Sequence, residues 1–301
     1  MIRCHSSLPS APPLVHQRPH LSASALTRRS LLLSAATASA SANSLAALSL
    51  PLPPPDITIT DRVFMDFSVC PNYFRPDRTL SDDLSTLCSG EEAGSAPIGR
   101  VVLGLYGRHV PLTVSNFKTM CTDHNASSYK YTLVNKIFPG QYFLAGRQGR
   151  RDKGEVGPLP DLERNTDTVN SKAFELKHSR AGVVSLCLSE NDDDEKIKMD
   201  TNYRNVEFLI TTGPGPCPHL DNRNIVFGTV LEGLDVVTSI ASIPTYMPSE
   251  RIRQFNDLAE LLGDERAQNA RAMWNRPLKT VFISDCGELK VSNPTLSPTL
   301  P

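Results

Sequence analysis

The amino-acid sequence predicts a mainly β fold, either a closed antiparallel barrel or a sandwich, with a helical hairpin inserted before the last strand. Eight short strand-like segments recur between residues 63 and 284, and turn-forming residues separate them. Only two apolar helices interrupt the strands, and we expect them to cover the ends of a barrel. No internal repeat is evident.

The strand-like segments either alternate apolar and polar residues or form short apolar runs. They are 63–69, 100–107, 131–138, 142–145, 182–188, 206–211, 225–231 and 278–284. The first helix is expected over 111–122, where Pro111 suits the first turn. Its apolar residues recur at helical spacing on one face, namely Val110, Val114, Phe117 and Met120. The second helix is expected over 234–243, after a turn at Gly233.

Three segments extend this simple pattern. Residues 70–98 are rich in Pro, Asp, Ser and Gly and are predicted to form a long loop, and residues 291–301 a disordered tail. Residues 245–277 are predicted to form the helical hairpin, in which Gly263 ends one helix and Asp264 caps the next. The first helix has one apolar face, formed by Ile252, Phe255, Leu258, Ala259 and Leu262. We interpret the charged outer face of the hairpin as solvated surface, with a partner-docking surface as the alternative.

The composition is that of a soluble globular protein. The chain has 301 residues, of which 40% are hydrophobic, enough for a buried core. No apolar stretch approaches the ~18 uninterrupted residues of a membrane span, so no transmembrane segment is expected. The formal net charge is −1, which gives no reason to expect nucleic acid or an anionic membrane as a partner.

The N-terminus reads as a two-part targeting signal over residues 1–42. Residues 1–55 contain four Arg and no Asp or Glu and are rich in Ser and Ala, as in an organelle transit peptide. Arg28-Arg29 then precedes a short apolar run and small residues that suit cleavage, which is a twin-arginine export pattern. Together these signals predict the thylakoid lumen of the chloroplast. A mitochondrial presequence, or a disordered N-terminus that is not removed, is the alternative. Residues 43–59 then form a Pro-rich leader to a domain over 60–290.

Six cysteines remain once the signal is removed, and none forms a C-x-x-C pair, so no metal site is expected. Cys70 and Cys88 flank one polar segment and are the candidate disulfide in an oxidising compartment. The alternative is that all six thiols are free and mostly buried. Ser185 and Cys187 have no recognisable His and acid partners, so a hydrolase is not predicted.

An ordered set of motifs resembles the cyclophilin family of peptidyl-prolyl isomerases across roughly residues 60–290. In family order they are 99–106, 110–117, 136–140, 181–186, 207–211, 220–228, 230–233 and 283–287. With the lumen signal and the helical insert, the chain is most similar to divergent lumenal members from plants. The resemblance implies a closed, eight-stranded antiparallel barrel capped by two helices. It also implies catalysed rotation about X–Pro bonds, which needs no cofactor.

The family's site residues are largely replaced in this sequence. Lys136 stands in place of the family arginine and is the candidate catalytic residue, although Lys is a mobile point donor rather than a planar fork. Leu209, Leu220 and Tyr142 keep half of the apolar floor that holds proline, while the polar clamp is rewritten. The positions implied for binding a proline peptide are Asn135, Gln141, Tyr142, Leu144, Cys187, Leu188, Glu207, Leu209, His219, Leu220 and Asn224.

The resemblance therefore predicts an isomerase that assists protein folding in the lumen with weakened catalysis. Its partners would be Pro-containing peptide segments or lumenal client proteins. The alternative is a non-catalytic scaffold for the assembly of lumenal or photosynthetic complexes, which grips a partner through the 70–98 loop or the 245–277 hairpin. A proline-peptide binder without turnover is a third, intermediate possibility.

Overall fold

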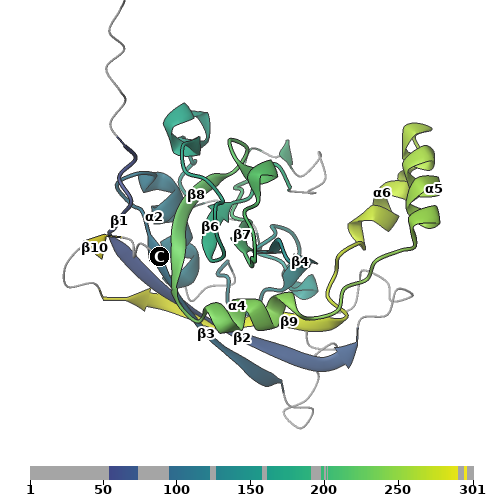
Figure 1. Ribbon diagram of the computed structural model, residues 1–301, viewed down its shortest axis with the longest axis horizontal. Coiled ribbons are helices and arrows are strands. Elements are labelled where there is room, and N and C mark those ends of the chain that lie inside the picture. The colour runs from purple at the N-terminus through teal and green to yellow at the C-terminus, as the bar shows by residue number, and fades with distance from the viewer. Residues whose placement is uncertain are drawn as a thin grey trace, which may run out of the picture. The chain divides into compact units, whose positions relative to one another are not determined.

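The computed structural model describes residues 54–73, 95–122, 127–157, 161–190, 198–199, 201, 203–290 and 295–296. Within these residues, eight antiparallel strands form one curved sheet with the order β4-β5-β7-β6-β8-β3-β2-β9 (Figure 1). Their bounds are β2 (Asp61–Tyr73), β3 (Ala96–Leu105), β4 (Val134–Phe138), β5 (Tyr142–Ala145), β6 (Val183–Leu186), β7 (Phe208–Thr211), β8 (Ile225–Glu232) and β9 (Lys279–Leu289).

The two edges of the sheet meet and close the barrel. The chain just before β4 runs beside β9, where the N–H of Tyr131 donates to the carbonyl of Ile283 at 2.7 Å. The N–H of Ile283 in turn donates to the carbonyl of Thr132 at 2.9 Å. The closed eight-stranded barrel predicted from the sequence is confirmed, and closure leaves no long unpaired edge.

Helices α2 (Pro111–Thr122) and α4 (Leu234–Ala241) pack their apolar faces against the main core. On α2, Phe117 is buried and its ring lies 5.2 Å from that of Phe208 and 4.7 Å from that of Phe227. On α4, Val237 and Ile240 are fully buried. Both helices form where the apolar spacing predicted them, because burying one apolar stripe stabilises a short helix.

The structure corrects the predicted ends of the barrel domain. Strand β2 continues to Tyr73 and β3 begins at Ala96, so both enter the segment predicted as a loop over 70–98. The middle of that segment lies outside the described residues. The tail predicted to be disordered over 291–301 contains β10 (Thr295–Leu296), which pairs antiparallel with β1 (Thr58–Ile59). Ile59 is buried, so this pairing is anchored by an apolar side chain.

The insert forms the predicted pair of helices, α5 (Glu250–Leu261) and α6 (Glu265–Ala272), which project beyond the barrel strands (Figure 1). The Asp264 side chain caps α6 by accepting from the N–H of Arg266 at 3.0 Å, and Gly263 has the positive φ of +79° that ends α5. No residue of α5 is buried. No helix in the described ranges is both long enough and apolar enough to span a membrane.

The cysteines do not all remain reduced. Cys121, Cys187, Cys217 and Cys286 are buried free thiols. Cys70 is disulfide-bonded, so the alternative with six free thiols is excluded. Cys88 lies outside the described residues, and its pairing with Cys70 stays a prediction.

Candidate functional site

One row of paired residues carries the candidate site across four strands. Lys136 on β4 pairs with Leu144 on β5, which pairs with Leu209 on β7, which pairs with Ser185 on β6. Directly paired residues of antiparallel strands point to the same face of a sheet. The register therefore places the cationic candidate, Lys136, at one end of a row of apolar side chains.

The apolar side chains of this face form a small cluster of their own, separate from the main core. Its buried members are Tyr142, Leu144, Cys187, Leu209, Cys217 and Leu220. Phe138 packs against them, with its ring stacked 4.6 Å from that of Tyr142. We call this cluster the floor. Five of its six buried members were predicted as peptide-binding residues, whereas Cys217 was missed because it lies on a loop without periodic pattern.

The floor is closed in this structure. Its six buried side chains are at most 2% exposed, so a proline ring cannot reach them without movement of a neighbour. The Tyr142 hydroxyl donates a hydrogen bond to the carboxylate of Glu190, and burial raises the pKa of Tyr142. Glu190 was not predicted as a site residue. Displacing it from Tyr142 is the smallest change that would begin to open the floor.

Lys136 is a buried cation, with 8% of its surface exposed. Burial lowers its pKa to about 8, and repulsion by Arg147 and Arg276 adds to this effect. The carboxylate of Glu207, also buried, opposes the shift by attraction. The ammonium group therefore persists at neutral pH but is lost under mildly alkaline conditions.

Two of the predicted binding residues use their amides to hold the chain itself. The Asn224 Oδ1 accepts from the N–H groups of Leu188 at 2.7 Å and Ser189 at 3.1 Å. With its amide oriented to satisfy both neighbours, Asn135 donates to the carbonyl of Leu133 and accepts from the N–H of Arg147. These groups position loops beside the floor. By contrast, the side chains of Gln141 and His219 are exposed at its rim.

A buried histidine network, which the sequence did not predict, lies under the floor. His178 Nδ1 lies 2.9 Å from Asp221 Oδ1, and His178 Nε2 lies 2.6 Å from Ser185 Oγ. Because a carboxylate only accepts, Nδ1 carries the proton and the Ser185 hydroxyl donates to Nε2. The expectation that Ser185 lacks His and acid partners is wrong, since residues distant in sequence meet here. Ser185 is fully buried, so the network fixes the segment that supplies Leu220 and offers no accessible nucleophile.

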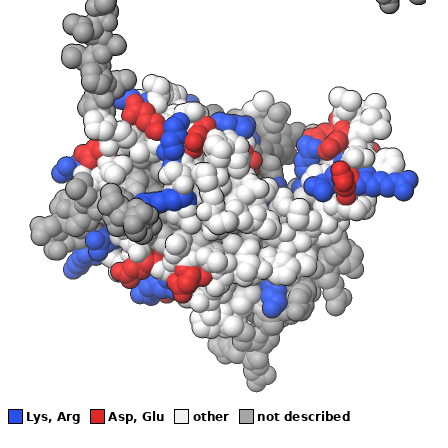
Figure 2. Space-filling model, in the orientation of Figure 1, with Lys and Arg blue, Asp and Glu red and all other residues white. Residues whose placement is uncertain are grey.

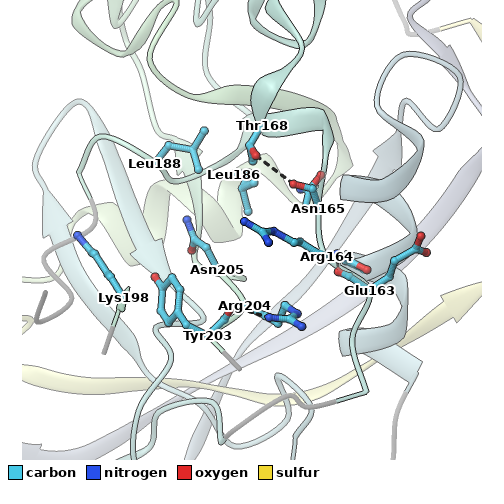
Figure 3. A pocket seen from close by; sticks show the side chains of 11 residues that line it. Glu163, Arg164, Asn165, Thr168, Leu186, Leu188, Lys198, Tyr203, Arg204 and Asn205 are labelled. Carbon is cyan, nitrogen blue, oxygen red and sulfur yellow. Dashed lines mark hydrogen bonds between the residues drawn. The ribbon is translucent and has the colours of Figure 1, made fainter. Parts of the chain in front are cut away.

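An open pocket of about 320 Å³ lies next to the floor (Figure 3). The Asn205 side chain at its wall donates to the carbonyl of Cys187 at 2.6 Å, so pocket and floor share this stretch of backbone. Arg204 fixes the rim by donating to the carbonyls of Leu162, Thr201 and Tyr203. The lining residues are Asn116, Glu163, Arg164, Asn165, Thr168, Leu186, Leu188, Lys198, Tyr203, Arg204 and Asn205.

Comparison with known proteins gives consistent matches to one family. The model described as cyclophilin type peptidyl-prolyl cis-trans isomerase/CLD matches residues 92–257. The chloroplastic peptidyl-prolyl cis-trans isomerase CYP28 of Arabidopsis thaliana is 74% identical over 249 residues, which cover 82% of this chain and 87% of the relative. Peptidyl-prolyl cis-trans isomerase D of Saccharomyces cerevisiae is 29% identical over 65% of this chain and 69% of its own. The chloroplastic isomerase CYP26-2 of Arabidopsis thaliana is 27% identical over 64% and 65% of the two chains.

Proposed function

The chain belongs to the family of cyclophilin-type peptidyl-prolyl cis-trans isomerases, and we propose that it catalyses rotation about X–Pro bonds of client proteins in the thylakoid lumen, with weakened activity. One observation carries this proposal. Lys136 and the floor share one face of the barrel, because Lys136 pairs with Leu144 and Leu144 with Leu209. A cation beside an apolar floor can favour the twisted, non-resonant amide over the planar one.

The geometry also gives the reasons for weakened catalysis. Lys136 offers a point charge instead of a planar fork, so its donors are less well aligned with an amide. The attraction of Glu207 partly neutralises that charge. The floor must also open before it can hold proline, and a site that is competent only part of the time binds more weakly in proportion.

Two observations support the location in the thylakoid lumen. Two relatives from Arabidopsis thaliana are named as chloroplastic. The acid-free N-terminus and Arg28-Arg29 with its apolar run add the twin-arginine pattern. Import of the labelled chain into isolated chloroplasts tests this proposal, with an Arg28→Lys, Arg29→Lys double variant beside the wild type. We expect the wild type in the lumen and the variant held in the stroma, and equal distributions would contradict a twin-arginine route.

The isomerase proposal is tested by comparing two lysine variants. Lys136→Ala should lower kcat/KM for an X–Pro peptide by roughly 10²-fold, as for loss of one preorganised group. Lys172→Ala removes an exposed lysine outside the site and should leave kcat/KM unchanged. Exchange NMR measures both without a coupling protease. Equal activity of the two variants, each shown to be folded, would remove Lys136 from the mechanism.

The exposed face of α5 favours a second candidate function, a non-catalytic scaffold. Ile252, Phe255 and Leu258 are each more than half exposed, on a hairpin that carries charges of both signs (Figure 2). Contiguous exposed apolar surface of this kind is typical of interaction sites. In a plant line lacking the protein, rescue by Lys136→Ala but not by Phe255→Glu would favour the scaffold. Val169→Glu, at an exposed apolar residue outside the hairpin, is the matched control.

A further inference from the structure

Arg276 closes the stem of the α5–α6 hairpin beside the strand that carries Lys136. The N–H of Asn275 donates to the carbonyl of Tyr246 at 2.9 Å, and the N–H of Tyr246 donates to the carbonyl of Arg276 at 2.8 Å. The carbonyl of Asn275 accepts from the N–H of Ile137, the residue after Lys136, at 2.8 Å. Backbone hydrogen bonds therefore fix Arg276 next to β4, independently of the two helices of the insert.

The guanidinium group of Arg276 is half-buried and has acceptors to spare for none of its donors within the chain. It forms no hydrogen bond and no ion pair with any residue that the structure describes. Burial lowers its pKa, as does repulsion by Arg147, but a guanidinium group stays protonated at any ordinary pH. A partly desolvated cation with unused N–H donors is costly unless an acceptor reaches it.

The surroundings of Arg276 carry an excess of positive charge. Arg147 and Arg276 both act on Lys136 by repulsion, so the three cations share one region beside the floor. Two carboxylates oppose them, because Glu207 attracts Lys136 and Glu155 attracts Arg276. The Glu155 carboxylate also lies 3.7 Å from the Nε of Arg147. Three cations against two carboxylates leave a place for one further negative charge.

We propose that Arg276, with Lys136 and Arg147, forms a subsite for a carboxylate, so that the protein prefers segments in which an acidic residue adjoins the proline. This inference rests on the proposed function, because it specifies which X–Pro segments occupy the same site. A carboxylate can accept two parallel N–H bonds from one guanidinium group, which suits the donors that Arg276 leaves unused. A neutral side chain in the same place satisfies neither the donors nor the charge.

The test compares peptides that differ only in charge next to proline. Blocked Ala-Glu-Pro-Phe and Ala-Gln-Pro-Phe form one pair, and Ala-Pro-Glu-Phe and Ala-Pro-Gln-Phe the other. Dissociation constants come from NMR titration of the full chain, and turnover of the same peptides from exchange NMR. Arg276→Gln removes the proposed donor and Arg276→Lys keeps its charge. Arg253→Gln removes an exposed arginine of the same insert as the matched control.

We expect the wild type to bind the Glu peptide of at least one pair roughly tenfold more tightly than its Gln partner, as for a charge-assisted bond. Arg276→Gln should abolish this preference, Arg276→Lys should keep part of it, and Arg253→Gln should keep all of it. Equal binding within both pairs, no binding of any peptide, or a preference that survives Arg276→Gln would overturn the subsite. A preference without turnover would uphold the subsite and contradict the isomerase; turnover without a preference would do the reverse.

Discussion

Raising the pH should switch off the charge of Lys136 within an accessible range. Burial lowers its pKa to about 8. If the ammonium group favours the twisted amide, turnover should follow its protonated fraction, about one half at pH 8 and about one tenth at pH 9. In Lys136→Arg the guanidinium group stays protonated, so the alkaline fall should disappear. The aligned donors of arginine should also raise kcat/KM at pH 7.

The same pKa has a consequence for stability, with the opposite sign. The folded-state pKa of Lys136 lies below the ordinary value of 10.5, so the unfolded chain binds more protons between these two values. The free energy of unfolding should therefore rise with pH from about 8 to 10.5, by about 3 kcal/mol in total from this group. Lys136→Arg should lack that rise, because both of its states remain protonated.

Two assays on the same pair of proteins measure these effects. Exchange NMR of a peptide without titratable groups, followed through carbon-bound protons, gives kcat/KM at pH 7, 8 and 9. Urea unfolding at pH 8, 9 and 10 gives the free energy of unfolding. Other groups that titrate in this range affect both proteins alike, so only the difference between them reports on Lys136. Parallel profiles for wild type and Lys136→Arg would refute the assignment of a lowered pKa and a charge-dependent role.

Three further results are expected. Glu190→Ala removes the carboxylate that holds the Tyr142 hydroxyl, so KM for an X–Pro peptide should fall by roughly tenfold; an unchanged KM would show that this contact does not close the floor. His178→Asn can keep a nitrogen near Asp221, whereas His178→Gln cannot, so urea denaturation should show a greater loss of stability for the Gln variant, by about 1–3 kcal/mol. Equal losses would mean that the Asp221 arm carries no special weight. Cys70 is disulfide-bonded, so reduction or Cys70→Ser should lower the free energy of unfolding by about 2–4 kcal/mol; peptide mass mapping should find Cys88 as its partner, and any other partner would contradict the pairing.

The barrel could be predicted because its strands and helices carry local periodic patterns. The helix over 111–122 and the strand over 142–145 have the predicted bounds. The strand predicted over 182–188 ends at Leu186. Beyond it, the N–H of Cys187 still donates to Glu207, but the N–H of Leu188 donates to the Asn224 side chain at 2.7 Å. Apolar pattern reports burial, and burial continues here after strand pairing has ended.

The candidate site was predictable only where a motif supplied the position. Lys136, Leu144 and Leu209 follow from the order of motifs, and pairing places them in one row. Contacts between loops leave no periodic signal, so the bond from Tyr142 to Glu190 and the His178 network could not be foreseen. The approach of Arg276 to β4 depends on hydrogen bonds at the stem of an insert, which no local pattern encodes.

Exchange NMR on the folded wild-type protein at pH 7 tests the central claim most directly. The observable is the rate of cis–trans exchange of a Pro-containing peptide, with and without the protein. We expect exchange faster than the uncatalysed rate, and faster still in Lys136→Arg. An exchange rate equal to that of the free peptide, from a sample whose spectrum shows a folded barrel, would contradict an isomerase and leave the scaffold.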